Sequence, residues 1–513
     1  MRTLKPRPRL IRFAPLAACL TVALTTKDIP ASEIALAAPV HPDFSAPAQL
    51  GGGSILPVTS CADDGSVGTL REVIGHAISG DTVDLSALSC STITLQTGVI
   101  DVTVDDLTIL GPGKQALTID GNDQSLVLKH TGAGTLTVRA LTVVNGHNTD
   151  DTGYTAPWIC DYCTYIGGGG IYSSHDLAIE NVAVNDCTVV ASGTVTARGG
   201  GVYARNHLTV ADSTFTGNTV AAEWVAMGGG AFGGRHVTMT SSRVSENTLG
   251  PHPNMISYGA GVAVACWYLD AQIEISGSEI TANIATQYSR GGGVFVCGSS
   301  TFTNTTISNN VGGSGGGVGQ NASVGSMSFV NSTISGNQAA AIGGGVLFYS
   351  APPSTLSVSN STVAFNTAGY YGGVGVMPAM PVDAEIEIQS SIVANNSPAG
   401  YFAADIGFFP DLSLVVTGSN NLVVDASPSV VLPGDTLSDD PQLLPLANNG
   451  GFSATHGLTS TSPAVDNGNN VLSLEFDQRG TGYARESGLR ADIGAFEMQQ
   501  VPEDIVFRDG FDG

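Results

Sequence analysis

The stretch GGGVYARNHLTVADSTFTGN, residues 199–218, is one copy of a phrase that recurs eight times between Gly167 and Asn395. Each copy has a glycine cluster and an apolar residue, a variable stretch, and a β-rich phrase that ends in asparagine. The aligned glycines recur at a similar spacing from copy to copy and are Gly170, Gly201, Gly230, Gly261, Gly293, Gly317, Gly345 and Gly373. The closing asparagines keep a matching period and are Asn218, Asn247, Asn283, Asn310, Asn337, Asn366 and Asn395.

A period of roughly 29 residues, with β-branched alternation and no helical pattern, indicates that each copy is one coil of short strands. Such a coil cannot bury its apolar face alone, so neighbouring coils must stack. We therefore predict an all-β fold, a single right-handed parallel β-helix of about 10 to 13 coils with capped ends, roughly 50 to 60 Å long. Alternating apolar residues such as Leu208, Val210 and Phe215 are predicted to fill its interior.

The same period explains two features of the composition. Glycine, with 66 residues, recurs where the coil bends sharply or where two backbones approach closely. Asparagine recurs because its amide both donates and accepts hydrogen bonds, so stacked copies can form an internal ladder at a corner. We therefore interpret most repeated Gly and Asn positions as structural.

The charge of the chain argues against a nucleic-acid partner. Lys and Arg number 19 against 44 Asp and Glu. A basic start, an apolar run from Phe13 to Leu24 and small residues up to Ala37 are typical of a signal peptide. Its removal takes away six cations and two anions, so the net charge changes from −25 to −29. This charge would repel phosphate backbones, and it favours solubility and weak cation binding over docking to anionic polymers.

Breaks in the repeat pattern divide the chain into six expected segments. They are a signal peptide (1–37), a linker (38–57), an N-terminal cap (58–95), the β-helix repeats (96–438), a C-terminal cap module (439–498) and a tail (499–513). No segment after the signal peptide has about twenty uninterrupted apolar residues, so no transmembrane span is expected in the mature chain. The oligomeric state does not follow from these patterns.

Cysteine usage fits an oxidising compartment, since seven of the eight cysteines remain after cleavage at Ala37. Cys266 and Cys297 are separated by one repeat period and could form a disulfide between adjacent coils. Cys61 and Cys90 could join parts of the N-terminal cap.

Cys160 and Cys163 form a lone CxxC motif, with Cys187 one strand later. A zinc site would need a fourth ligand, for which His175 is the nearby candidate. A disulfide with one remaining thiol is the favoured interpretation, and no metal site is predicted here.

The N-terminal cap contains a helical pattern in which Leu70, Val73, Ile74 and Ala77 share one face. The run from Gly68 to Val73 resembles the Cys-Ser-Leu-Arg-Glu-Ala (CSLREA) signature of the N-terminal module of bacterial secreted β-helix proteins. The cysteine and the alanine of that signature are absent here, so the match is partial.

The C-terminal segment resembles the terminal module of bacterial surface β-helix proteins that carry interchangeable anchoring tails, a choice-of-anchor type. The resembling residues are Asp440, Pro441, Asn449, Gly450, Gly451, His456, Ser462, Pro463, Ala464, Asp466, Asp477, Arg479, Gly480, Asp492, Gly494 and Glu497. The repeats resemble those of polymorphic outer-membrane proteins, and the last residues, FRDGFDG, resemble a short tail of secreted gammaproteobacterial proteins. These resemblances imply a protein secreted by a bacterium or held at its outer surface, where several relatives are adhesins.

The acidic and basic residues of the C-terminal segment invite a catalytic or calcium interpretation. We favour a structural one, in which Asp477 with Arg479, and Asp492 with backbone amides, form charge-assisted hydrogen bonds that close the last coils. No cofactor is predicted, although calcium remains possible.

An enzymatic alternative comes from the fold class, because right-handed β-helices include pectate lyases and polygalacturonases. Lys114 and Lys129 are the only lysines after the signal peptide, and Arg198 and Arg290 are three coils apart. Residues 146–151, GHNTDD, resemble parts of two polygalacturonase motifs, but the rest of those motifs is missing. A polysaccharide lyase or glycoside hydrolase is therefore the alternative hypothesis, and no catalytic residue is assigned.

The leading hypothesis is adhesion or carbohydrate binding without catalysis. An insertion between Asn145 and Gly167 carries four aromatic residues, Tyr154, Trp158, Tyr162 and Tyr165. Insertions in solenoids emerge as loops, and aromatic side chains there could stack on sugar rings or on a host or cell-surface protein. A structural role in the cell envelope is the third hypothesis.

Overall fold

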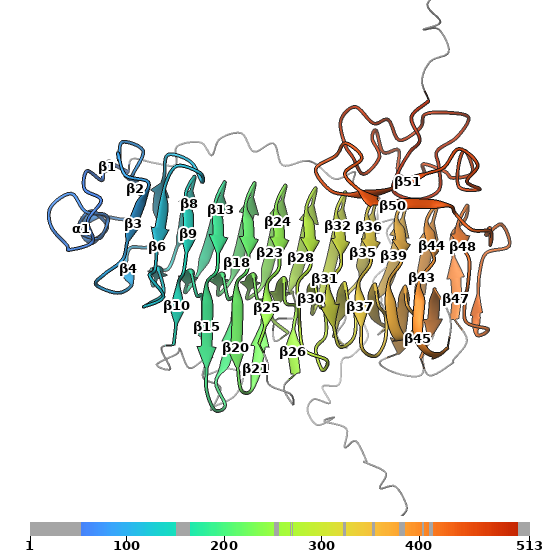
Figure 1. Cartoon of the computed structure of the whole chain (residues 1–513), viewed down its shortest axis with the longest axis horizontal. Coiled ribbons are helices and arrows are strands. Elements are labelled where there is room, and N and C mark those ends of the chain that lie inside the picture. The colour runs from blue at the N-terminus through green and yellow to red at the C-terminus, as the bar shows by residue number, and fades with distance from the viewer. Residues whose placement is uncertain are drawn as a thin grey trace, which may run out of the picture. The chain divides into compact units, whose positions relative to one another are not determined.

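The computed structural model describes residues 53–149, 165–250, 256–266, 268, 270–321, 325–350, 354–378, 385–402, 405–409 and 414–500. All of them belong to one unit, Pro47–Gly513. The described residues form 51 short strands and one α-helix. Because the strands of successive coils stack in parallel, the chain is a β-solenoid (Figure 1).

Three long parallel sheets run along the stack. Sheet I contains β1 (Ile55–Pro57), β2 (Asp81–Asp84), β5 (Leu107–Leu110), β8 (Thr135–Arg139), β13 (Asp176–Glu180), β18 (His207–Ala211), β23 (His236–Thr240), β28 (Gln272–Ser276), β31 (Ser299–Thr303), β35 (Met327–Val330), β39 (Thr355–Ser359), β43 (Glu385–Gln389), β47 (Leu414–Thr417) and β49 (Val430–Val431). Sheet II contains β3 (Thr92–Thr94), β6 (Thr118–Asp120), β9 (Thr142–Val144), β14 (Ala183–Asn185), β19 (Thr214–Thr216), β24 (Arg243–Ser245), β29 (Glu279–Thr281), β32 (Thr306–Ser308), β36 (Thr333–Ser335), β40 (Thr362–Ala364), β44 (Ile392–Ala394) and β48 (Leu422–Val423).

Sheet III has 11 strands, one for each complete coil. They are β4 (Ile100–Val102), β7 (Leu128–His130), β12 (Ile171–Ser173), β17 (Val202–Ala204), β22 (Ala231–Gly233), β27 (Val262–Val264), β30 (Val294–Val296), β34 (Val318–Gln320), β38 (Val346–Ser350), β42 (Val374–Pro378) and β46 (Ile406–Phe408). The predicted all-β solenoid and its expected number of coils are therefore confirmed.

Shorter sheets complete the coils. Sheet IV contains β10 (His147–Asn148), β15 (Thr188–Ala191), β20 (Thr219–Ala222) and β25 (Thr248–Leu249). Sheet V contains β11 (Tyr165–Gly167), β16 (Thr196–Arg198), β21 (Val225–Met227) and β26 (Ile256–Tyr258). A later sheet contains β33 (Val311–Gly312), β37 (Gln338–Ala339), β41 (Thr367–Tyr370) and β45 (Ser397–Phe402).

Side chains stack in the interior as the alternation predicts. Leu208 and Val210 of β18 lie in register with Leu177 and Ile179 of β13, and all four are buried. Phe215 of β19 is also buried. Since equivalent apolar residues meet in every coil, the core is one continuous column along the stack.

An asparagine ladder fixes one corner of each coil. The side-chain oxygen of Asn310 accepts hydrogen bonds from the backbone N–H and the side-chain amide of Asn283, at 3.0 and 2.9 Å. Its amide donates to the Ile280 carbonyl and to Asn337, both at 2.9 Å. The same pattern repeats at the other members, which are Asn218, Asn247, Asn283, Asn337, Asn366 and Asn396.

One predicted ladder position is wrong by one residue. Asn396, not Asn395, accepts from Asn366, whereas Asn395 occupies the adjacent turn with a φ of 60°. The two neighbouring asparagines are chemically identical, so sequence alone does not separate the inward residue from the turn residue.

The repeated glycines are required by the ladder beside them. A Cβ at Gly201 would lie 2.5 Å from the Gly230 carbonyl oxygen and 3.1 Å from the Asn218 side-chain amide. A Cβ at Gly230 would meet the Asn247 amide at 3.0 Å. Glycine and asparagine therefore recur together because the backbone of one must pass close to the side chain of the other.

Different residues occupy the two ends of the ladder. At its N-terminal end Cys187 takes the asparagine position, and its backbone N–H donates to Asn218 at 3.0 Å. Cys187 is a free, buried thiol, and burial raises its pKa to about 12. At the other end the buried carboxylate of Asp405 accepts from the backbone and the side chain of Asn396, both at 2.8 Å.

The N-terminal end carries the predicted helix, α1 (Leu70–His76), which lies against β2 and β4 (Figure 1). Thr69 caps it by accepting from the Glu72 N–H, and Glu72 accepts at 3.0 Å from the N–H of Gly68, one residue before the N-cap, in a variant of the capping box. Arg71 pairs with Asp63 at 2.9 Å. The residues that resemble the bacterial signature thus form the start of a helix that covers the first coil.

Within the described residues two disulfides are present, both at predicted pairs. Cys61 is bonded to Cys90, and Cys266 is bonded to Cys297. The other predicted pair, Cys160 and Cys163, lies outside the described residues. Within the described residues no helix is both long and apolar enough to cross a bilayer.

The C-terminal segment packs along the flank of the stack, over sheet II. It contains an antiparallel pair, β50 (Leu443–Ala447) and β51 (Thr455–Leu458), drawn in orange and red beside β32 to β48 (Figure 1). Among the described residues, its hydrogen bond nearest the N-terminal end of the stack runs from the Ala454 N–H to Glu279 of β29. Toward the C-terminal end, its apolar side chains pack on Leu422 of β48. The last coil itself is continued by single pairings, Leu422 with Leu437 and Ile406 with Ala426. The segment expected to close the last coils thus packs laterally over several coils, including the last ones at Asn420 and Leu422.

Sheet II and the turns beside it provide polar groups for this packing. The hydroxyl of Thr333 donates to Gln478 at 2.6 Å, and the hydroxyl of Thr362 accepts from the Ala495 N–H at 3.1 Å. Asn331, Asn360, Ser390 and Asn420, all with positive φ, also bond to the segment. Each coil thus places a polar group in the same column, and this column explains why the C-terminal segment lies parallel to the long axis of the stack.

We expect Asn310→Ala to lower the free energy of unfolding by about 3 kcal/mol, because it leaves buried amide and carbonyl groups of Asn283, Ile280 and Asn337 without partners. The measurement is urea unfolding followed by circular dichroism. Gln338→Ala, at an exposed position of the next coil, should change it by no more than about 0.5 kcal/mol. Equal effects of the two substitutions would contradict the role of the ladder.

Asp405 should make stability depend on pH. Burial raises its pKa from 3.8 to about 6, so the native chain binds this proton more tightly than the unfolded chain. Stability is therefore present at low pH and is lost as pH rises from about 4 to about 6, by at most about 3 kcal/mol. Asp405→Asn should remove this part of the pH profile, as measured by urea unfolding at several pH values. The exposed Asp439→Asn is the control, and parallel profiles for all three proteins would contradict the assignment.

Candidate functional site

Sheets IV and V form a lateral projection of the solenoid, which we call the wing (Figure 1). Small and branched apolar side chains fill the space between the two sheets. They are Ile166, Val189, Ala191, Ala197, Val220, Ala222, Ala226, Leu249, Ala260 and Ala285. The wing begins at β10 and β11, which are the edge strands of their sheets, and the preceding coil has no equivalent strands among the described residues. The first coil of the wing therefore makes a step in the surface.

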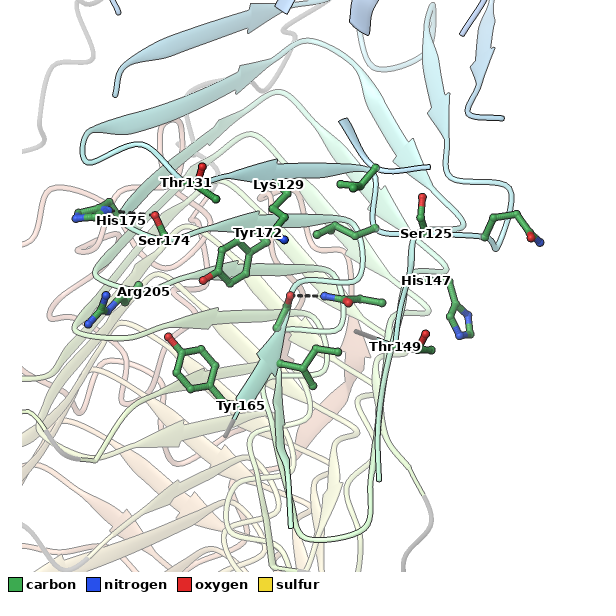
Figure 2. Close-up of a pocket in the computed structure, with 16 residues that line it drawn as sticks. Ser125, Lys129, Thr131, His147, Thr149, Tyr165, Tyr172, Ser174, His175 and Arg205 are labelled. Carbon is green, nitrogen blue, oxygen red and sulfur yellow. Dashed lines mark hydrogen bonds between the residues drawn. The ribbon is translucent and has the colours of Figure 1, made fainter. Parts of the chain in front are cut away.

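A groove of about 590 Å³ lies at this step. One side comes from β7 and β12 of sheet III, and the other from residues around β10 and β11. Figure 2 shows Lys129 above Tyr172, with His175 and Arg205 on one side and His147 and Thr149 on the other. The groove combines an aromatic surface, two cations and several hydroxyl groups.

An aromatic stack ends in the groove. The rings of Tyr172, Tyr203 and Phe232 occupy equivalent positions of three coils, with centroids 5.1 and 5.3 Å apart and nearly parallel planes. In the coil before Tyr172 the equivalent residue is Lys129. The stack is thus continued by a flexible cation instead of a ring, and Tyr172 is only partly buried.

The cationic side of the groove is built from the ends of strands. The residue that follows each strand occupies an equivalent position in three successive coils: Thr131 after β7, Ser174 after β12 and Arg205 after β17. The equivalence is shown by their backbone N–H groups, each of which donates to a carbonyl of the preceding coil. The hydroxyl of Ser174 is 3.2 Å from Nδ1 of His175. None of the described residues that line the groove is a carboxylate. Neighbouring carboxylates among the described residues include Asp101, in register with Lys129, Asp123, next to Gln124, and Asp176, next to His175.

Arg198 stabilises the wall behind the groove. Its guanidinium is buried and lies 4.4 Å from the ring centroid of Tyr165 and 5.6 Å from that of Phe232. Burial lowers its pKa, while the neighbouring tyrosines favour the charged form. We interpret Arg198 as a structural residue that joins the wing to sheet III through cation–π contacts.

The predicted aromatic site is only partly within the described residues. Tyr154, Trp158 and Tyr162 lie outside them, as do Asp150 and Asp151. Tyr165 lies elsewhere than expected: its side chain is 4% exposed, it packs on Tyr203 at 5.7 Å between centroids, and it forms a wall of the groove. Tyr165 begins sheet V, so its ring points toward the outer face of sheet III and not to solvent.

The residues considered for catalysis are separated. The amide of Asn148 donates to the Gly167 and Gly168 carbonyls at 2.8 and 3.1 Å, a structural bond at the base of the wing. Arg290 lies in the same column as Arg198 and bonds to Asn321 and to the Tyr349 hydroxyl. Lys114 donates to the Asp212 carbonyl at 2.8 Å. Lys129 is the one of these cations that lines the groove.

The charged residues of the C-terminal segment form a compact network within it. Arg479 pairs with Asp477 at 2.6 Å and lies between the rings of Tyr483 and Phe496, 3.9 Å from each centroid. Asp492 accepts from the backbone N–H groups of Asp466 and Met498, at 2.8 and 2.7 Å. The predicted charge-assisted hydrogen bonds are present, and they hold this segment together.

Among the described residues no three His, Cys, Asp or Glu side chains converge on one point. This includes His175 and Cys187, the described members of the zinc alternative. Cys187 lies inside the coil, with its sulfur 3.4 Å from the Gly146 backbone nitrogen, whereas His175 lines the groove.

Tyr172, Arg205 and the contribution of Lys129 to one groove were not predicted from the sequence. Tyr172 belongs to the phrase GGGGIY and was hidden among structural repeats. The sequence feature that could have indicated the groove is the insertion itself. A coil that carries an insertion is larger than the coil before it, so the surface must have a step between the two.

Comparisons with known proteins give no family assignment. No protein-family model matches the chain, and no curated protein matches it. Among solved structures, the crystal structure of pectate lyase Pel9A is similar with 14% identity and a TM-score of 0.42, over 88% of this chain and 97% of that chain. A mannuronic acid specific polysaccharide family 6 lyase from human gut microbiota is similar with 10% identity and a TM-score of 0.22, over 71% and 86% of the two chains. The class of the protein, a parallel β-solenoid, rests on its own strand pairing.

We expect Tyr165→Ala to lower the free energy of unfolding by about 3 kcal/mol, because the buried ring packs on Tyr203 and Arg198. Trp224→Ala, at a wing residue that is 59% exposed, should change stability by no more than about 0.5 kcal/mol. Urea unfolding of both variants tests this difference. A stable Tyr165→Ala protein would show that the ring does not support the groove.

Proposed function

We propose that this chain is an exported, secreted or surface-held β-helix protein that binds carbohydrate in the groove without altering it. The observation that carries the proposal is the end of the aromatic stack at Tyr172, in a groove that also presents hydroxyl groups. A sugar ring has apolar C–H faces and a polar rim, so it is matched by an aromatic face surrounded by hydrogen-bonding groups.

Several features support the accompanying location. The two disulfides fit an oxidising compartment, and the sequence starts with a segment typical of export. The partial resemblance to bacterial secreted and surface β-helix proteins points the same way. A solenoid suits adhesion because it presents a site on a rigid, extended scaffold.

The groove also contains an observation that favours the lyase alternative. β-Elimination on a uronate needs a base for the proton beside the carboxylate and a positive charge that neutralises that carboxylate. Lys129 and Arg205 provide two cations in one groove. Binding without product is placed first because the aromatic face of Tyr172 and the hydroxyl groups of the groove suit a bound sugar ring.

The test is retention of the purified secreted chain on an array of neutral and acidic polysaccharides, with the ultraviolet absorbance of unsaturated sugars read in parallel. Retention without product supports the proposal. Product formation would support the lyase alternative, and absence of both signals would leave a structural role or a protein partner.

We expect Tyr172→Ala to weaken glycan binding about tenfold, through loss of about 1.4 kcal/mol of stacking. Tyr172→Phe should retain binding, because it keeps the ring. Trp224→Ala is the matched control for an exposed aromatic outside the groove. Binding is measured by isothermal titration calorimetry, and unchanged binding by Tyr172→Ala would exclude the groove as the site.

A further inference from the structure

We infer that the groove selects saccharides that carry an anionic group, and that Lys129 with Arg205 forms the anion-binding end of the site. This inference rests on the proposed function and names the class of sugar that the groove would take. The net charge of the whole chain would not predict anion binding, because a strong negative charge repels polyanions.

The local charge of the groove differs from that of the chain. After the expected cleavage only 13 Lys and Arg residues remain, and two of them, Lys129 and Arg205, line one groove of 16 residues. The lining also includes the ring nitrogens of His147 and His175, which can form hydrogen bonds. At physiological ionic strength charges more than about 8 Å away are largely screened, so the local charge is set by the two cations and by the neighbouring carboxylates of Asp101, Asp123 and Asp176, none of which lines the groove.

The positions of the two cations suit one bound sugar. Lys129 is two coils from Tyr203, which corresponds to about 9.6 Å along the stack, and Arg205 lies two positions beyond Tyr203. Tyr172 occupies the coil between them. Long side chains from both ends can therefore reach the edge of a ring that lies on Tyr172, where a carboxylate or sulfate projects.

The chemistry of Lys129 strengthens this assignment. It forms no ion pair with any carboxylate of the described residues, whereas six other described cations, all of them arginines, do: Arg71, Arg139, Arg235, Arg243, Arg479 and Arg485. Lys129 precedes three stacked aromatic rings in the same column, so its ammonium group is placed where a ring substituent of a sugar stacked on Tyr172 would be. Arg205 adds planar donors that suit carboxylate or sulfate oxygens.

The experiment compares oligogalacturonate with its fully methyl-esterified form, which has the same backbone without the charge. At about 0.15 M salt, where nearby charges act and remote ones are screened, the free acid should bind about tenfold more tightly. Lys129→Gln and Arg205→Gln should each reduce this preference without changing the affinity for the ester. Arg490→Gln, which removes an exposed cation of the C-terminal segment, should leave the preference unchanged.

The outcomes distinguish failure of the anionic inference from failure of the proposed sugar binding. If acid and ester bind equally, and Tyr172→Ala weakens both, the groove binds sugars and the anionic inference is wrong. If neither form binds, a sulfated oligosaccharide of the same length distinguishes the remaining anionic source. Binding of the sulfated probe that depends on Lys129 supports the inference, and failure of all three probes overturns it together with the proposed function.

Discussion

The hydrogen bonds of the asparagine ladder set the register on which the rest of the structure depends. Each ladder amide joins its own coil to the next and also fills the corner beside a glycine. Because the ladder fixes the register of each coil on the next from Cys187 to Asp405, equivalent residues stack along these coils. The apolar core, the aromatic stack and the polar column beneath the C-terminal segment are all consequences of that register.

The candidate site arises where the repeat changes, not where it is most regular. Coils of equal size produce smooth columns, and a smooth column offers little concave surface. The wing enlarges the coils from β10 onward, and the step at its first coil leaves the end of an aromatic column beside residues of a smaller coil. A groove at a change of coil size thus needs no special loop, only an insertion that stacks on its successors.

Sequence reasoning predicted the solenoid well because its signal repeats. The period, the glycine phrases and the closing asparagines all indicate the same contact, which is the stacking of one coil on the next. The spacing of Cys266 and Cys297 follows from the coil length. The site was harder, because Lys129, Tyr172 and Arg205 belong to three different coils and are far apart in the sequence. Their proximity follows only from the register, as does the difference between Asn395 and Asn396. The burial of Tyr165 depends on how sheet V folds over sheet III, which no local pattern encodes.

The lengthwise packing of the C-terminal segment has a mechanical consequence. Its bonds to Glu279, Thr333, Thr362 and Asn420 are distributed over several coils. A force applied through the C-terminal end and directed along the stack would load these bonds together in shear, instead of opening the last coil one bond at a time. Bonds loaded in parallel share the force, so the flank would resist pulling better than a simple plug at the end of the solenoid.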